Sequence, residues 1–170
     1  MEIWTIGHSN HAFEKFLGLL QQHEITLLVD VRAKPFSRFP QFTRSNLSDA
    51  LRANKIEYLF GGKYLGGLSP TPITEPMFVV KMDAILKQVA GGQRVTLMCS
   101  EGKPLECHRA GKLTAWLHRH SPDIKTTHIL TDGTLVDGRE FEPHVNDNVI
   151  WRDFKASIVR LEKKRTKKCC

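Results

Sequence analysis

Residues 95–109 read Val-Thr-Leu-Met-Cys-Ser-Glu-Gly-Lys-Pro-Leu-Glu-Cys-His-Arg, and this stretch decides which fold class the sequence predicts. Its first four residues are apolar or β-branched, as in a buried strand, and Ala110, Leu113 and Leu117 then recur with helical spacing. A strand, a polar loop and a helix N-terminus follow one another. In a parallel α/β sheet, ligands bind at this carboxyl edge because loops gather there and helix N-termini offer free N–H groups. We therefore expect the active site around this loop.

Strands and helices alternate along the rest of the chain. Strands are expected at 2–6, 25–31, 56–60 and 124–130, and helices at about 11–20, 45–54, 76–90, 107–118 and 148–163. Ser9 or Asn10 is the expected N-cap of the first helix, and Thr74 that of the helix that enters through Pro76. Residues 61–75 are expected to form a long irregular loop. The pattern predicts a three-layer α/β fold of Rossmann-like type, with a mostly parallel sheet and helices on both faces.

Length and composition indicate one globular domain, expected at 1–162, followed by a basic tail at 163–170. The formal net charge is +7, but five tail cations supply most of it, so the basic balance favours nucleic-acid contact only weakly. The start has no signal-peptide pattern, which predicts a cytoplasmic protein. The four cysteines are then expected as thiols rather than disulfides.

Four interpretations of the loop after residue 98 remain open. Cys99 or Cys107 could be a catalytic thiolate, activated by the helix N-terminus and the neighbouring His108 and Arg109. Arg109 could instead hold an anion while Glu101 acts as acid or base. Cys99, Cys107 and His108 could bind a metal, but structural zinc usually has four ligands with paired short spacings, so no metal site is predicted. The loop could also be purely structural, with packed thiols and solvated charges.

Polar residues also follow two other predicted strands. Gly7 would let the chain turn out of the first strand and place His8 and Ser9 at the carboxyl edge. Asp30 ends a nearly all-apolar strand, where a carboxylate must be paired or functional, and Arg32 on the same face is its expected partner.

The loop at 33–42 interleaves Lys34 and Arg38 with Phe36, Phe39 and Phe42. Cations and aromatic rings suit nucleotides or nucleobases, although the phenylalanines could equally anchor the loop to the core.

Several motifs together resemble a known family. They are Thr5–Ser9, Val29–Arg32 with Pro35 and Ser37, Tyr64–Gly67, and Cys99–Glu101 with Cys107–Arg109. In this order they are similar to the bacterial and archaeal family of domain of unknown function 488, over about residues 2–130. The resemblance implies an α/β domain whose polar motifs come from several strand ends, and it implies no particular activity.

A second likeness is to sulfurtransferases of the rhodanese type. A strand ends in Asp30-Val31-Arg32, and a later strand ends in Cys99 before a loop and a helix. In those enzymes an arginine closely follows the cysteine in a tight loop of backbone amides, and the span from Cys99 to Arg109 is too long for that arrangement. Sulfur transfer is therefore an alternative rather than the first hypothesis.

The sequence favours an enzyme, a hydrolase or group transferase, acting on a phosphate-bearing small molecule, nucleotide or nucleic acid. The alternatives are a nucleic-acid-binding module without catalysis and a cysteine-dependent thiol or sulfur-transfer enzyme. The sequence leaves the cofactor unknown. The predicted catalytic residues are His8, Asp30, Cys99, Glu101 and Cys107, and the predicted substrate- or anion-binding residues are Ser9, Arg32, Ser37, Tyr64, His108 and Arg109.

Overall fold

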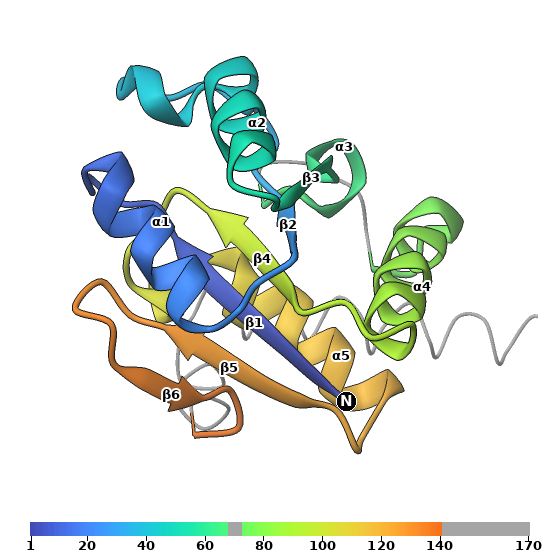
Figure 1. Ribbon diagram of the computed structural model, residues 1–170. Coiled ribbons are helices and arrows are strands. Elements are labelled where there is room, and N and C mark those ends of the chain that lie inside the picture. The colour runs from blue at the N-terminus through green and yellow to red at the C-terminus, as the bar shows by residue number, and fades with distance from the viewer. Residues whose placement is uncertain (68–72, 141–170) are drawn as a thin grey trace, which may run out of the picture.

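The computed structural model describes residues 1–67 and 73–140 (Figure 1). Its centre is a six-stranded sheet of order β3-β2-β4-β1-β5-β6. The strands are β1 (Glu2–Gly7), β2 (Leu27–Asp30), β3 (Glu57–Phe60), β4 (Val95–Cys99), β5 (Lys125–Ile129) and β6 (Leu135–Asp137). The first five are mutually parallel, and β6 pairs antiparallel with β5.

Helices cover both faces of this sheet. They are α1 (Phe13–Gln22), α2 (Arg44–Ala53), α3 (Gly62–Leu65), α4 (Pro76–Ala90) and α5 (Ala115–His120), with short 3₁₀ turns at Pro40–Phe42 and Pro104–Glu106 and a π-helix at Arg109–Thr114. The apolar residues of α1 and α2 pack with one face of the sheet, and those of α4 and α5 pack with the other. This confirms the predicted three-layer α/β class.

Alternation along the strands divides the core into these two clusters. Leu27 and Val29 face the α4 side, whereas Leu28 between them faces the α1 side. Strands buried on both faces need apolar residues at successive positions, which is why β2 and β4 read as continuous apolar runs. Within the described ranges, no helix has both the length and the apolar character required to span a membrane.

Several local predictions were wrong. The N-cap of α1 is Ala12, not Ser9 or Asn10, because the chain continues from β1 beside β4 through backbone hydrogen bonds from His8 to Cys99 and from Ser9 to Ser100. The N-cap of α4 is Glu75, not Thr74, and the Glu75 carboxylate accepts from the Phe78 amide at 2.9 Å.

Two other segments differ from the expected secondary structure. The stretch expected to be irregular contains α3, and the expected helix at 107–118 begins as a π-helix, in which Thr114 donates its hydroxyl to the Arg109 carbonyl at 2.8 Å. The closing helix expected at 148–163, the domain boundary at 162 and the basic tail lie outside the described residues.

The strand register aligns the carboxyl ends of β1, β2 and β4 at one edge of the sheet. Gly7 of β1 is paired with Cys99 of β4, and Asp30 of β2 is paired with Met98. A Cβ on Gly7 would lie 1.8 Å from the Glu101 carbonyl oxygen, so only glycine allows the loop after β4 to cross this close to β1. The loops after β1, β2 and β4 therefore leave the sheet side by side.

Candidate functional site

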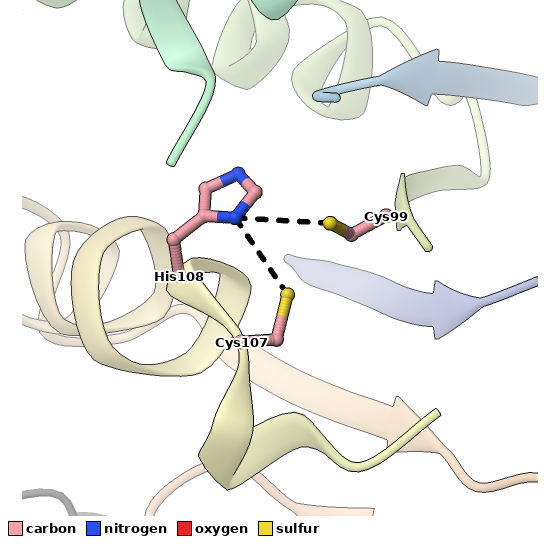
Figure 2. Close-up of side chains that lie close together, drawn as sticks. All are labelled: Cys99, Cys107 and His108. Carbon is pink, nitrogen blue, oxygen red and sulfur yellow. Dashed lines mark hydrogen bonds between the residues drawn. The ribbon is translucent and has the colours of Figure 1, made fainter. Parts of the chain in front are cut away.

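Three soft ligand atoms meet beyond the end of β4. The sulfur atoms of Cys99 and Cys107 and a ring nitrogen of His108 all lie within 4.8 Å of one another (Figure 2). The Nδ1 atom of His108 is 3.7 Å from Cys99 Sγ and 3.6 Å from Cys107 Sγ. All three side chains are buried, at 3 to 8% exposure. We call them the Cys99–Cys107–His108 cluster.

A change in backbone conformation makes neighbouring residues converge on one point. Cys107 is extended, with φ −125° and ψ 141°, and His108 is helical, with φ −58° and ψ −18°. In a continuing strand, consecutive side chains would point in opposite directions. The change to helical geometry between these two residues turns both side chains toward Cys99, as Figure 2 shows.

The orientation of the His108 ring is fixed from two sides. Its Nε2 lies 3.2 Å from the Val31 carbonyl oxygen, which can only accept, so Nε2 carries the proton. In the neutral ring, Nδ1 then has a free lone pair, and it faces the two sulfurs. A Cβ on Gly67 would approach the ring to 2.7 Å, so the chain at residue 67 packs directly against the imidazole.

Hydrogen bonds also shift the acidity of the two thiols in opposite directions. The hydrogen bond from the Cys107 thiol is the largest effect on Cys99, and it lowers the pKa of Cys99 despite its burial. The same contact with Cys99, together with burial, raises the pKa of Cys107. Of the two thiols, Cys99 is therefore the more acidic.

Arg109 holds the loop in place. It is fully buried, and its guanidinium donates to the backbone carbonyls of Glu101 and, at 2.9 Å, of Gly102. Its backbone amide lies 3.5 Å from Cys107 Sγ and donates to it. These contacts make Arg109 a residue that shapes the loop between the two cysteines, and they turn its cation toward the backbone.

A second buried network lies at the end of β2. Arg32 pairs with Asp30 through two donors, Nε at 2.9 Å and Nη2 at 2.6 Å, which confirms the predicted ion pair. Tyr58 donates its hydroxyl to Asp30 at 2.8 Å, and Arg32 also donates to the Phe42 carbonyl. Burial and the neighbouring carboxylate raise the pKa of Tyr58. Both side chains of the ion pair are buried, so their charges neutralise each other inside the protein.

His8 joins this network as a neutral ring. Its Nδ1 donates to the Ser9 carbonyl at 2.8 Å, and its Nε2 accepts from Arg32 at 3.3 Å. The ring also stacks on Phe42, with centroids 4.3 Å apart. Burial lowers the pKa of His8 from its ordinary value to about 4, and the nearby Arg32 cation adds to this effect.

An open cavity of about 580 Å³ lies over these strand ends. Residues after three strands line it: His8, Ser9 and Asn10 after β1; Phe36, Ser37, Arg38 and Phe39 after β2; Ser100 and Glu101 after β4. In the loop after β2, Phe36 is 80% exposed and Phe42 is buried, so the phenylalanines divide between the surface and the core. The Arg38 guanidinium lies 5.0 Å from the centroid of the Phe39 ring.

The structure thus separates the predicted site residues into groups. His8, Ser9, Ser37 and Glu101 line the cavity, and Cys99, Cys107 and His108 form the cluster. Asp30, Arg32 and Arg109 are buried in internal contacts. Tyr64 lies on α3, and of the described residues that line the cavity none comes from that helix.

Sequence reasoning missed several residues that matter here. Tyr58 reads as an ordinary strand aromatic, and its bond to Asp30 follows only from the adjacency of β3 and β2. Asn10 and Ser100 also line the cavity; Ser100 directly follows β4, and Asn10 lies three residues after the end of β1.

Comparison with known proteins gives a partial match. No curated protein and no solved structure matched the chain. Residues 12–72 match the model of one family, described as domain of unknown function DUF488. The motifs around His8 and from Cys99 to Arg109 lie outside the matched segment. This match supports, over residues 12–72, the resemblance to the DUF488 family that the motifs predict.

Proposed function

We propose that the chain is an enzyme, a hydrolase or group transferase, that binds a phosphate-bearing small molecule in the cavity over the ends of β1, β2 and β4. One observation carries this proposal: side chains from three separate strand ends line a single cavity of about 580 Å³. That volume is within the range of small-molecule sites, and its position at the carboxyl edge is where open α/β sheets bind ligands.

The residues lining the cavity suit a phosphate attached to a ring. Arg38 supplies a cation, and the hydroxyls of Ser9, Ser37 and Ser100 supply donors for phosphate oxygens. The exposed Phe36 ring offers a face on which a base can stack. Arg38 takes the anion-binding role expected for Arg32 and Arg109, because those two guanidiniums are buried in internal contacts.

The carboxylate in the cavity favours catalysis over binding alone. Glu101 lines the same cavity as Arg38, and a carboxylate beside a phosphate weakens simple anion binding. A catalyst gains from it, because a carboxylate can accept the proton of an attacking water or hydroxyl. In this proposal Glu101 is the general base. His8 lines the site as an uncharged residue without a catalytic role, because both of its ring nitrogens are already hydrogen-bonded.

One observation supports nucleic-acid binding as a second candidate. Lys34, Phe36 and Arg38 are exposed at alternate positions of the loop after β2. Cations that alternate with an aromatic ring can follow a single-stranded backbone while a base stacks. In that case Lys34 and Arg38 would contribute alike, whereas in the cavity proposal only Arg38 lines the site.

The experiment follows from this contrast. Calorimetry measures the binding of three ligands: nucleoside monophosphates, inorganic phosphate and a short single-stranded oligonucleotide. The proteins compared are the unmodified chain, Arg38→Ala and Lys34→Ala. A second assay measures phosphate release from nucleotides. We expect Arg38→Ala to weaken mononucleotide binding by ~10–100-fold, since a charge-assisted hydrogen bond contributes ~1.5–3 kcal/mol, and Lys34→Ala to leave it unchanged.

The controls separate the candidates. Glu101→Gln should abolish phosphate release without weakening binding, since it removes the base but keeps the shape of the side chain. Oligonucleotide binding that both loop variants weaken equally, with no mononucleotide binding and no turnover, would favour the binding module. The proposal is wrong if no phosphate compound binds at millimolar concentration.

A further inference from the structure

We infer that Cys99, Cys107 and His108 form a binding site for one soft divalent cation of the zinc type. The site goes beyond the proposed function, because its three residues differ from those that line the cavity.

The distances within the cluster fit such an ion. Zinc bonds sulfur at ~2.3 Å and imidazole nitrogen at ~2.0–2.1 Å, so in a tetrahedral site a sulfur and a nitrogen ligand lie ~3.6 Å apart. The observed separations from His108 Nδ1 are 3.7 Å to Cys99 Sγ and 3.6 Å to Cys107 Sγ. The two sulfur-to-nitrogen separations thus match those around a shared zinc ion, and the two sulfurs lie within 4.8 Å of each other.

The lone pair of His108 Nδ1 is directed at both sulfur atoms. Because Nε2 carries the proton toward Val31, Nδ1 has a lone pair available for a cation, and it faces the two sulfurs at nearly equal distance, as ligands of one shared ion would stand. One cation in the centre would satisfy the lone pair and both sulfurs together. Two thiolates and a divalent ion also sum to zero charge, which reduces the cost of burying the site.

Contacts around the ligands resemble those that support protein metal sites. A metal-binding histidine usually donates its other ring N–H to a carboxylate or carbonyl, as His108 does to Val31. The Arg109 amide donates to Cys107 Sγ at 3.5 Å. Arg109 also fixes the loop between the two cysteines through the carbonyls of Glu101 and Gly102.

The three ligands leave a fourth position, as in catalytic zinc sites, where water or substrate completes the tetrahedron. Thiolate and imidazole ligands favour Zn²⁺ over Mg²⁺ or Ca²⁺, which prefer oxygen. The site should therefore discriminate strongly between these ions.

The test uses the full chain with Cys169→Ser and Cys170→Ser, which removes the two tail cysteines as competing ligands. Zn²⁺ content is measured after dialysis, and Co²⁺ is added as a spectroscopic probe. We expect about one ion per chain, and sulfur-to-cobalt charge-transfer bands with the intense visible bands of tetrahedral cobalt. Mg²⁺ in large excess should not displace the ion.

Variants identify the ligands. Cys107→Ser should lower the charge-transfer intensity and weaken Zn²⁺ binding by at least ~100-fold, and His108→Gln should weaken it similarly, because each removes one of three ligands. His120→Gln, at an exposed histidine stacked on Trp116, is the matched control and should leave binding unchanged. The cobalt spectrum of the unsubstituted cluster gives an answer even if a variant does not fold.

Failure to bind Zn²⁺ or Co²⁺ at micromolar concentration would overturn the inference, as would a cobalt spectrum without sulfur charge transfer. A chain that binds no ion but whose Cys99 is alkylated rapidly would instead favour the cysteine-dependent alternative. Neither outcome affects the cavity proposal, whose readouts are nucleotide binding and turnover.

Discussion

The Nε2 atom of His108 lies 3.2 Å from the carbonyl oxygen of Val31, and this contact joins the loop after β4 to the end of β2. The contact determines which ring nitrogen is protonated and aims the other at Cys99 and Cys107. A backbone carbonyl therefore determines the chemistry available to the cluster, and a change near either residue should alter it.

Gly67→Ala should weaken ion binding without removing a ligand. A Cβ at this position would lie 2.7 Å from the His108 ring, so the imidazole must move. Changes in groups that orient metal ligands typically cost ~10–100-fold in affinity, and we expect a loss of that order in Zn²⁺ titrations. The matched control is Gly18→Ala on α1, where a Cβ meets nothing within 4 Å. Unchanged affinity in Gly67→Ala would contradict the role assigned to the ring position.

Acid should destabilise the protein through His8. Its pKa is lowered to about 4 in the folded state, so between pH 6.5 and 4 the unfolded chain binds more protons. The contribution of neutral His8 to the free energy of unfolding is fully present above pH 6.5 and is lost as the pH falls toward 4. For a pKa shift of this size, the contribution is at most ~3 kcal/mol. Urea unfolding at pH 7, 6, 5 and 4 measures it, and His8→Phe should flatten the dependence. Parallel pH curves for the two proteins would rule out His8 as the cause.

The ion pair of Asp30 and Arg32 should show strong energetic coupling. Asp30→Asn leaves the buried guanidinium with no carboxylate and should lower the free energy of unfolding by ~3–5 kcal/mol. Replacing both residues, with Asp30→Leu and Arg32→Met, should cost less than the sum of the losses for Asp30→Leu alone and Arg32→Met alone. A double-mutant cycle by urea unfolding measures the difference, and additive losses would show that the pair is not coupled.

Tyr58→Phe provides a smaller test of the same network. The Tyr58 hydroxyl donates to Asp30 at 2.8 Å, and its removal deletes one hydrogen bond to a charged group. We expect a loss of ~1.5–3 kcal/mol in the free energy of unfolding, since the ring itself is kept. Tyr64→Phe is the control, because Tyr64 lies on α3 rather than beside β2. Equal effects of the two substitutions would contradict the assignment.

The sequence predicts the layers of this fold well, because apolar periodicity reports burial directly. The runs at 27–30 and 95–99 are buried on both faces, as their continuous apolar character indicates. Strand order is not encoded in this way, and the insertion of β4 between β2 and β1 emerges only in three dimensions. That insertion brings Val31 beside His108 and Cys99 beside Gly7.

The sequence predicts which residues belong to the candidate site, but not how they are arranged in space. Sequence order places Cys99, Cys107 and His108 in one loop, but an isolated group of three ligands without paired short spacings argued against a metal. Their convergence depends on the backbone change between Cys107 and His108, which no propensity reports. Arg109 was expected to hold an anion, and its contacts with two loop carbonyls follow from a close approach that Gly7 permits.

A crystal structure of the full chain grown with a nucleoside monophosphate tests the proposed function most directly. We predict electron density in the cavity, with the phosphate within hydrogen-bond distance of Arg38 and the hydroxyls of Ser9 or Ser37, the base against Phe36, and Glu101 beside the phosphate. A cavity without ligand at millimolar nucleotide, or a nucleotide bound only at another surface, would contradict the proposal.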